Sequence, residues 1–212
     1  MNTIDLQDLE RKAFRSNFQD GLWDIFLGLM LVQMCFGPIL GGYYGLAPTT
    51  ILLILLLYAA VVLGGFWYAK KYIILPRLGV VKFSQQRQKR RKRFKLVLSI
   101  SVAWGVALFG IFLGLYQTGV PTNVTGPVIL YGLAIVFGVG AVIVFSLMAY
   151  TMDFTRAYVY GWFYAFGVLS TFWLMEQGVF FPYGAVLLTA IMVLIGLVLF
   201  IRFLHEHPLQ DR

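Results

Sequence analysis

The sequence predicts an all-α membrane protein. We expect a bundle of six transmembrane helices, both termini in the cytoplasm, a short amphipathic N-terminal helix and a basic cytoplasmic loop between spans two and three. The chain is 60% hydrophobic and 12% charged, against about 45–50% apolar and about 25% charged in soluble domains. Six segments approach the roughly 20 apolar residues that cross a bilayer core. All Lys and Arg residues fall where a six-span chain places them on one side of the membrane.

The N-terminal segment, residues 1–20, precedes the first span and mixes charges with apolar residues at helical spacing. Thr3 is suited to cap the start of this helix. The apolar positions are Leu6, Leu9, Ala13, Phe14 and Phe18. Such a helix would lie on the membrane surface, or pack against the basic loop.

The predicted spans form one membrane domain over residues 21–204, followed by a cytoplasmic tail at 205–212. They cover residues 22–43, 50–69, 96–116, 128–150, 157–177 and 185–203. The connections at 45–48, 118–127 and 178–184 contain Gly and Pro, which break helices, and no Lys or Arg.

The distribution of positive charge predicts the orientation. Eleven of the 17 Lys and Arg residues lie in the basic loop, residues 70–95, and the others lie in the N-terminal segment, at Arg156, and at Arg202 and Arg212 near the C-terminus. The positive-inside rule places all these regions in the cytoplasm, which predicts a multi-pass protein of the cell membrane. Aromatic residues mark the two membrane interfaces expected for this orientation. They are Tyr43, Tyr44, Tyr116 and Tyr183 at the outer interface, and Trp23, Trp67, Tyr68, Tyr150 and Tyr158 at the inner one.

Small residues predict where the helices approach one another, since helices in lipid associate through small side chains. Bundle packing within the chain is favoured over a dedicated dimer face. The candidates are Gly64, Gly65, Gly110, Gly114, Ala134, Gly138, Gly161 and Gly167.

The basic loop is the first candidate site. Its positive charges are expected to bind anionic lipid headgroups; the alternative is that they serve only as the topology signal. The expected lipid contacts are Lys70, Lys71, Arg77, Lys82, Arg87, Lys89, Arg90, Arg91, Lys92, Arg93 and Lys95. Nucleic acid is not expected, because the run lies against the bilayer. β-prone residues at 72–75 and 80–83, around a Pro and Gly turn, predict a small hairpin at the start of the loop.

Three polar residues in the spans form a second candidate site, because polar groups are costly in a bilayer. Asp24, in the first turn of span one, is expected to anchor that helix by an ion pair with a loop Lys or Arg. Gln33 lies about 18 Å into the same span and could line a ligand site near a bend at Pro38. The commoner alternative is a hydrogen bond to a Ser or Thr of another helix. Glu176 is expected to be solvated near the outer end of span five, or to line an entry path.

Other polar residues indicate local roles. Asp153 and Arg156, spaced i, i+3, predict an ion pair or cap in the cytoplasmic turn between spans four and five. His205 and His207 would point to different faces of a helix, so no metal site is expected. No cofactor is expected either, and no zinc-protease or serine-hydrolase motif is present.

Three classes of function remain open. We favour an accessory or assembly protein that contacts anionic lipid and a protein partner or second copy of the chain, because the spans contain few polar groups. A small-solute or ion transporter or channel, using polar groups of span one, is the alternative. A membrane enzyme without a recognisable motif is the third class.

Overall fold

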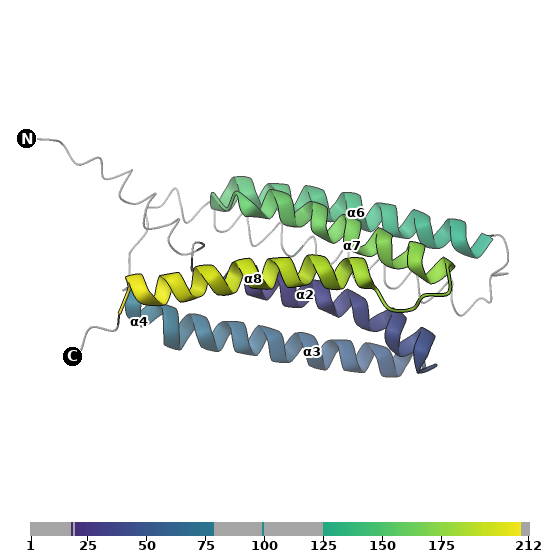
Figure 1. The fold of residues 1–212 in the computed structure, drawn as a ribbon, viewed down its shortest axis with the longest axis horizontal. Helices are drawn as coiled ribbons and strands as arrows, with labels where there is room; N and C mark the ends of the chain where they lie inside the picture. Colours follow the sequence, from purple (N-terminus) through teal and green to yellow (C-terminus); the bar gives the residue numbers. More distant parts are fainter. Residues whose placement is uncertain (1–17, 19, 79–98, 100–124, 209–212) are drawn as a thin grey trace, which may run out of the picture. The chain divides into compact units, whose positions relative to one another are not determined.

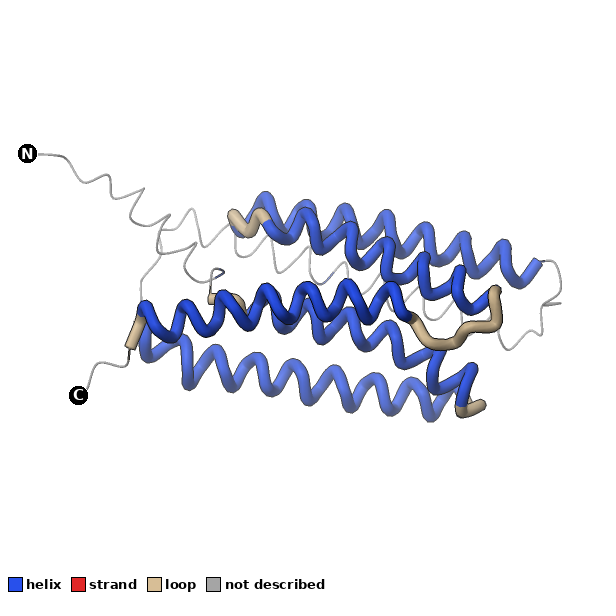
Figure 2. The backbone as a smooth tube through the Cα atoms, in the orientation of Figure 1, coloured by secondary structure: helices blue, strands red, loops and turns tan. Residues whose placement is uncertain are grey.

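The computed structural model describes residues 18, 20–78, 99 and 125–208, and within them it contains helices and no strand (Figures 1 and 2). Six of the helices are α-helices: α2 (Leu22–Pro38), α3 (Pro48–Ala69), α4 (Leu75–Leu78), α6 (Thr125–Met152), α7 (Arg156–Glu176) and α8 (Tyr183–Glu206). Two short segments are π-helical: η1 (Ile39–Tyr43) and η2 (Lys70–Ile74). The all-α prediction is therefore confirmed for this part of the chain.

Three described helices are long and apolar enough to cross a membrane: Pro48–Arg77, Tyr131–Met152 and Tyr183–Glu206. α2 contributes a shorter apolar stretch, Leu22–Gln33. α7 spans the predicted fifth segment, but it is not among the three. These helices make the chain a candidate multi-pass membrane protein. The predicted third span and N-terminal helix lie outside the described residues, apart from Ser99 and Phe18.

The chain divides into two compact units. Unit 1 comprises residues 1–85 and 187–212, and so contains α2, η1, α3, η2, α4 and nearly all of α8. Unit 2 comprises residues 86–186, with α6 and α7. Each unit is described by itself.

The first predicted span corresponds to α2 and η1 together, which cover residues 22–43. Gly21 precedes α2 with φ of 75°, a conformation that suits glycine. Directly after Pro38 the helix widens into η1, where the Tyr44 amide donates to the Ile39 carbonyl, five residues back, at 3.3 Å. A π-helical turn is one of the recognised sites of helix irregularity, and it lies where the sequence predicts a bend.

The predicted hairpin in the basic loop is wrong where the structure describes it. The helix that begins at Pro48 continues through η2 and α4, so residues 72–75 are helical. Pro76 lies in α4, near the C-terminal end of this continuous helix. Helical geometry buries Ile74 to 1% exposure in a cluster with Leu22 and Phe203, and this tertiary packing overrides a local β preference. Residues 80–83 lie outside the described part.

Unit 1 is built around a close contact between α2 and α8. A Cβ added at Gly21 would lie 2.3 Å from the Gly196 carbonyl oxygen, and one added at Gly28 would lie 2.8 Å from a Val193 methyl carbon. Leu31 is fully buried, as is Met192. Only glycine allows backbones to approach this closely. α3 runs beside α2 (Figure 1) but contains no fully buried residue.

Unit 2 contains a tightly packed α6–α7 pair (Figure 1). The two helices meet at small residues. A Cβ added at Gly161 would lie 3.0 Å from Phe145 Cβ, and one added at Gly138 would lie 3.2 Å from Ala165 Cβ. Of the predicted packing residues, Ala134, Gly138, Gly161 and Gly167 are buried. Within the described part of the chain, a Cβ added at Gly64 or Gly65 meets nothing within 4 Å, so these two glycines pack against none of the described helices. Gly110 and Gly114 lie outside the described residues.

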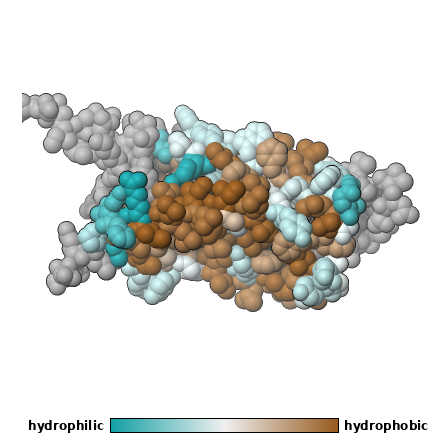
Figure 3. Space-filling view, viewed as in Figure 1, coloured by the Kyte–Doolittle hydropathy of each residue, from teal (hydrophilic) through white to brown (hydrophobic). Residues whose placement is uncertain are grey.

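The outward-facing side chains of these helices are largely apolar. In the space-filling view, hydrophobic residues cover the middle of α8, and hydrophilic residues gather at its C-terminal end (Figure 3). α3 exposes several large aliphatic side chains, Leu53, Leu56, Leu57, Val61 and Leu63. Exposed apolar surface on helices of this length is typical of contact with lipid.

Candidate functional site

A buried ion pair joins Asp20 and Lys70 at one end of unit 1. Asp20 Oδ2 lies 2.6 Å from Lys70 Nζ, with the Asp20 side chain fully buried and that of Lys70 20% exposed. The other oxygen, Oδ1, accepts a hydrogen bond from the Leu22 amide at 3.0 Å. Asp20 therefore holds the first turn of α2 and the first residue of η2 together.

The sequence predicted an anchoring ion pair of this kind for Asp24, and that ion pair stays a prediction. Asp24 lies in the first turn of α2, and it is fully buried, where the positive end of the helix dipole favours a carboxylate. Asp20 was missed, although an Asp two residues before a helix start is a known side-chain capping pattern. Its pairing with Lys70, fifty residues away, has no local signal.

Gln33 forms an interhelical hydrogen bond, with an acceptor that the sequence did not identify. Its Nε2 donates to the Leu55 carbonyl oxygen of α3 at 3.3 Å, whereas the sequence favoured a Ser or Thr. In the opposite direction, Tyr58 Oη of α3 donates to the Leu29 carbonyl oxygen of α2 at 2.9 Å. The two helices thus each supply one side-chain donor and one backbone acceptor.

Arg77 binds the C-terminal end of α8. Its Nη1 donates to the carbonyl oxygens of His207 at 2.8 Å and Leu204 at 3.4 Å. The last carbonyls of a helix lack intrahelical partners and carry partial negative charge, so this guanidinium stabilises the end of α8. Arg77 was predicted as a lipid contact, which stays a prediction, and this geometry gives it a role within unit 1.

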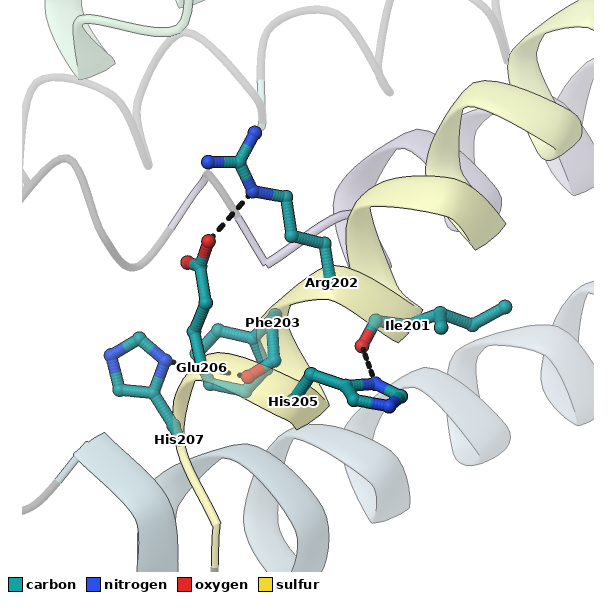
Figure 4. Close-up of polar contacts among 6 residues, drawn as sticks. All are labelled: Ile201, Arg202, Phe203, His205, Glu206 and His207. Atoms are coloured by element: carbon teal, nitrogen blue, oxygen red, sulfur yellow. Dashed lines mark hydrogen bonds and ion pairs between the residues drawn. The ribbon is translucent and has the colours of Figure 1, made fainter.

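The other polar side chains at the C-terminal end of α8 contact groups one turn away in the chain (Figure 4). Arg202 Nε lies 2.7 Å from Glu206 Oε1, one helical turn away. The imidazoles of His205 and His207 contact the carbonyl oxygens of Ile201 and Phe203, each one turn back. Among the described residues no group of three or more His, Cys, Asp or Glu is placed to hold a metal ion.

Lys71 differs from its neighbours Lys70 and Arg77 because it is exposed among aromatic rings. Its Nζ lies 5.0 Å from the centroid of the Trp67 ring and 5.2 Å from that of Tyr72. The rings of Tyr68 and Tyr72 are 4.7 Å apart. All three aromatic side chains are more than half exposed. We call Trp67, Tyr68, Lys71 and Tyr72 the Lys71 surface.

In unit 2, Glu176 is exposed and hydrogen-bonded. Tyr131 Oη donates to Glu176 Oε2 at 2.7 Å, which joins the end of α7 to α6. Asp153 lies in the turn between these helices, with φ of 53°. The Arg156 guanidinium carbon is 5.2 Å from the Phe154 ring centroid. The Asp153–Arg156 pair itself stays a prediction.

The predicted polar site of Asp24, Gln33 and Glu176 stays a prediction. Asp24 and Gln33 are nine residues apart in α2, about 14 Å along the helix axis, and Glu176 belongs to the other unit. The predicted lipid contacts from Lys82 to Lys95 lie outside the described residues. Among the described cations of the basic loop, Lys71 is exposed, beside Lys70 and Arg77, which hold the helices together.

Comparisons with family models, with curated proteins and with solved structures give no match to this chain.

Proposed function

We propose that the chain is a six-span accessory or assembly protein of the cell membrane, with both termini in the cytoplasm. It acts by contacts with anionic lipid and with a protein partner or second copy, without carrying out a reaction. Support for six spans comes from the candidate spans, from the helices α2 and α7 at predicted positions, and from the one-sided distribution of Lys and Arg.

The reciprocal hydrogen bonds between α2 and α3 carry this proposal. A solute pathway needs polar groups that face a shared, hydrated space. Gln33 and Tyr58, two polar side chains in the apolar stretches of these two helices, instead donate to backbone carbonyls of the partner helix. They therefore contribute to helix association, which is the usual role of polar groups within a membrane bundle.

The test is thiol accessibility at position 33. In a Cys35→Ala background, which removes the chain's only cysteine, Gln33→Cys and Tyr44→Cys are each exposed to a small membrane-impermeant thiol reagent in intact cells. Tyr44 is 66% exposed just after η1, at the end predicted to face outward, and serves as the matched control. We expect rapid labelling at position 44 and none at position 33, because a packed helix interface excludes water.

Two results would contradict the proposal. Labelling at position 33 at a rate near that at position 44 would indicate a hydrated pathway along α2. Labelling at position 44 only after the membrane is permeabilised would contradict the proposed orientation.

One observation favours a transporter as the second candidate. Two carboxylates, Asp20 and Asp24, are fully buried at the start of α2, and ionisable residues buried in membrane proteins frequently mark ion or proton pathways. Ion flux into proteoliposomes that is abolished by Asp24→Asn would establish this candidate. The accessory proposal expects no flux above protein-free vesicles.

A further inference from the structure

We propose that the Lys71 surface is a specific site for one anionic phospholipid, with Lys71 as the ligand of its phosphate. This inference rests on the proposed placement in a membrane. It gives Lys71 a specific lipid-binding role, beyond the general attraction of anionic headgroups by the basic loop.

The position of Lys71 along its helix matches the headgroup level. α3 contains 22 residues, from Pro48 to Ala69, which is about 33 Å at 1.5 Å per residue. A bilayer hydrocarbon core is about 30 Å thick. Since the helix continues without a break to Arg77, Lys71 lies nearly one turn, about 5 Å, beyond a hydrocarbon core that begins at Pro48, where lipid phosphates lie.

Of the cations described in this stretch, Lys71 is the one left to bind a ligand. Lys70 is paired with Asp20, and Arg77 donates to carbonyls of α8. Lys71 Nζ faces two aromatic rings, and within the described part of the chain no carboxylate lies within ion-pair distance of it. A cation over an aromatic face is held in place while its N–H groups remain available.

The surrounding rings suit a phospholipid better than a free anion. Trp67 lies one helical turn toward the apolar part of α3, and interfacial Trp and Tyr rings bury an apolar body while a polar tip stays at the headgroup. Tyr68 and Tyr72, whose rings are 4.7 Å apart, carry hydroxyl groups that can donate to a phosphate. Such a surface can therefore contact both the phosphate of a lipid and the start of its acyl chains.

Native mass spectrometry of the full chain in neutral detergent with added phosphatidylglycerol tests this site. Lys71→Gln is compared with Lys82→Gln, which removes the same charge from the basic loop, and with Lys71→Arg, which keeps the charge. We expect Lys71→Gln to lose one tightly retained phosphatidylglycerol and to bind it about five-fold more weakly, since one basic residue contributes about that factor. Lys82→Gln and Lys71→Arg should retain the lipid.

The other outcomes decide between this site and its alternatives. Equal, small losses in Lys71→Gln and Lys82→Gln would overturn the specific site and leave general attraction by the loop. Displacement of the lipid by excess inorganic phosphate would overturn a phospholipid site in favour of a free-anion site. Equal retention of phosphatidylglycerol and phosphatidylcholine by the unmodified protein would contradict the lipid role in the proposed function as well, so the two failures are distinguishable.

Discussion

The helix pairs α2–α3 and α6–α7 are both antiparallel hairpins of apolar helices, but they are joined by different interactions. α2 and α3 meet through polar donors, aromatic rings and the Asp20–Lys70 ion pair at one end. Aromatic contacts such as Phe26–Phe66, with ring centroids 4.6 Å apart, fill the space between them. α6 and α7 meet through glycine and alanine, at distances that leave little room for a larger side chain.

The difference shows two solutions to one physical problem. In lipid, apolar side chains gain little from contacting each other instead of the bilayer, so helix association depends on hydrogen bonds or on close backbone packing. α3 has no fully buried residue and relies on hydrogen bonds. α7 buries eight residues, including Gly161 and Ala165, and relies on close backbone packing. Removing a polar group should therefore weaken α2–α3, and enlarging a small residue should separate α6–α7.

The largest effect is expected from Lys70→Met. This change leaves the fully buried Asp20 carboxylate without its ammonium partner, and breaking a buried pair in this way typically costs about 3–5 kcal/mol. The measurement is denaturant unfolding of the full chain in detergent. Combining it with Asp20→Asn should recover part of the loss, since the buried side chain that has lost Lys70 is then neutral.

Lys71→Met is the matched control for that change, because Lys71 is the neighbouring residue and is exposed. It should alter the free energy of unfolding by less than about 0.5 kcal/mol. A cost equal to that of Lys70→Met would show that the ion pair with Asp20 is not what stabilises this end of α2–α3.

A smaller effect is expected from Gly161→Leu in α7. Its first added carbon would lie 3.0 Å from Phe145 Cβ and 3.2 Å from Val142 Cα, and overpacking of a close contact costs about 1–3 kcal/mol. The matched control is Gly65→Leu in α3, where an added Cβ meets nothing within 4 Å. That control should be neutral or stabilising, because Leu favours helix more than Gly by up to about 1 kcal/mol. Equal destabilisation of both variants in the same unfolding assay would contradict the distinction between the pairs.

Much of the helical layout could be predicted from the sequence, because it depends on local apolar length. Residues 157–177 and 185–203 were expected as spans, and the structure has α7 at Arg156–Glu176 and α8 at Tyr183–Glu206. The β-prone run predicted at 72–75 is helical in the structure, because the burial of Ile74 against Leu22 and Phe203 depends on distant residues.

The site residues were harder to predict for a related physical reason. An interhelical hydrogen bond from Gln33 could be expected, since an amide in a bilayer requires a partner. Its acceptor, the Leu55 carbonyl, could not be identified, because every residue has a carbonyl and only the packing of α2 on α3 selects one. The same holds for Asp20 and Lys70. Their residue types are ordinary, and their pairing depends on the register between two helices.

The smallest effects are expected from Gln33→Leu and Tyr58→Phe. Each removes one hydrogen bond from the α2–α3 interface, at 3.3 Å and 2.9 Å respectively, and such bonds in membrane proteins average about 0.6 kcal/mol and reach about 1.7. The freed carbonyls keep their intrahelical partners, so no buried acceptor is left empty. Thr151→Val in α6 is the control, because Thr151 Oγ1 bonds to the Leu147 carbonyl of its own helix and joins no pair. In a double-mutant cycle read by unfolding, each α2–α3 variant should lose measurable stability while Thr151→Val does not. No loss in the double variant would mean that aromatic packing and the Asp20–Lys70 pair hold α2 against α3 without these bonds.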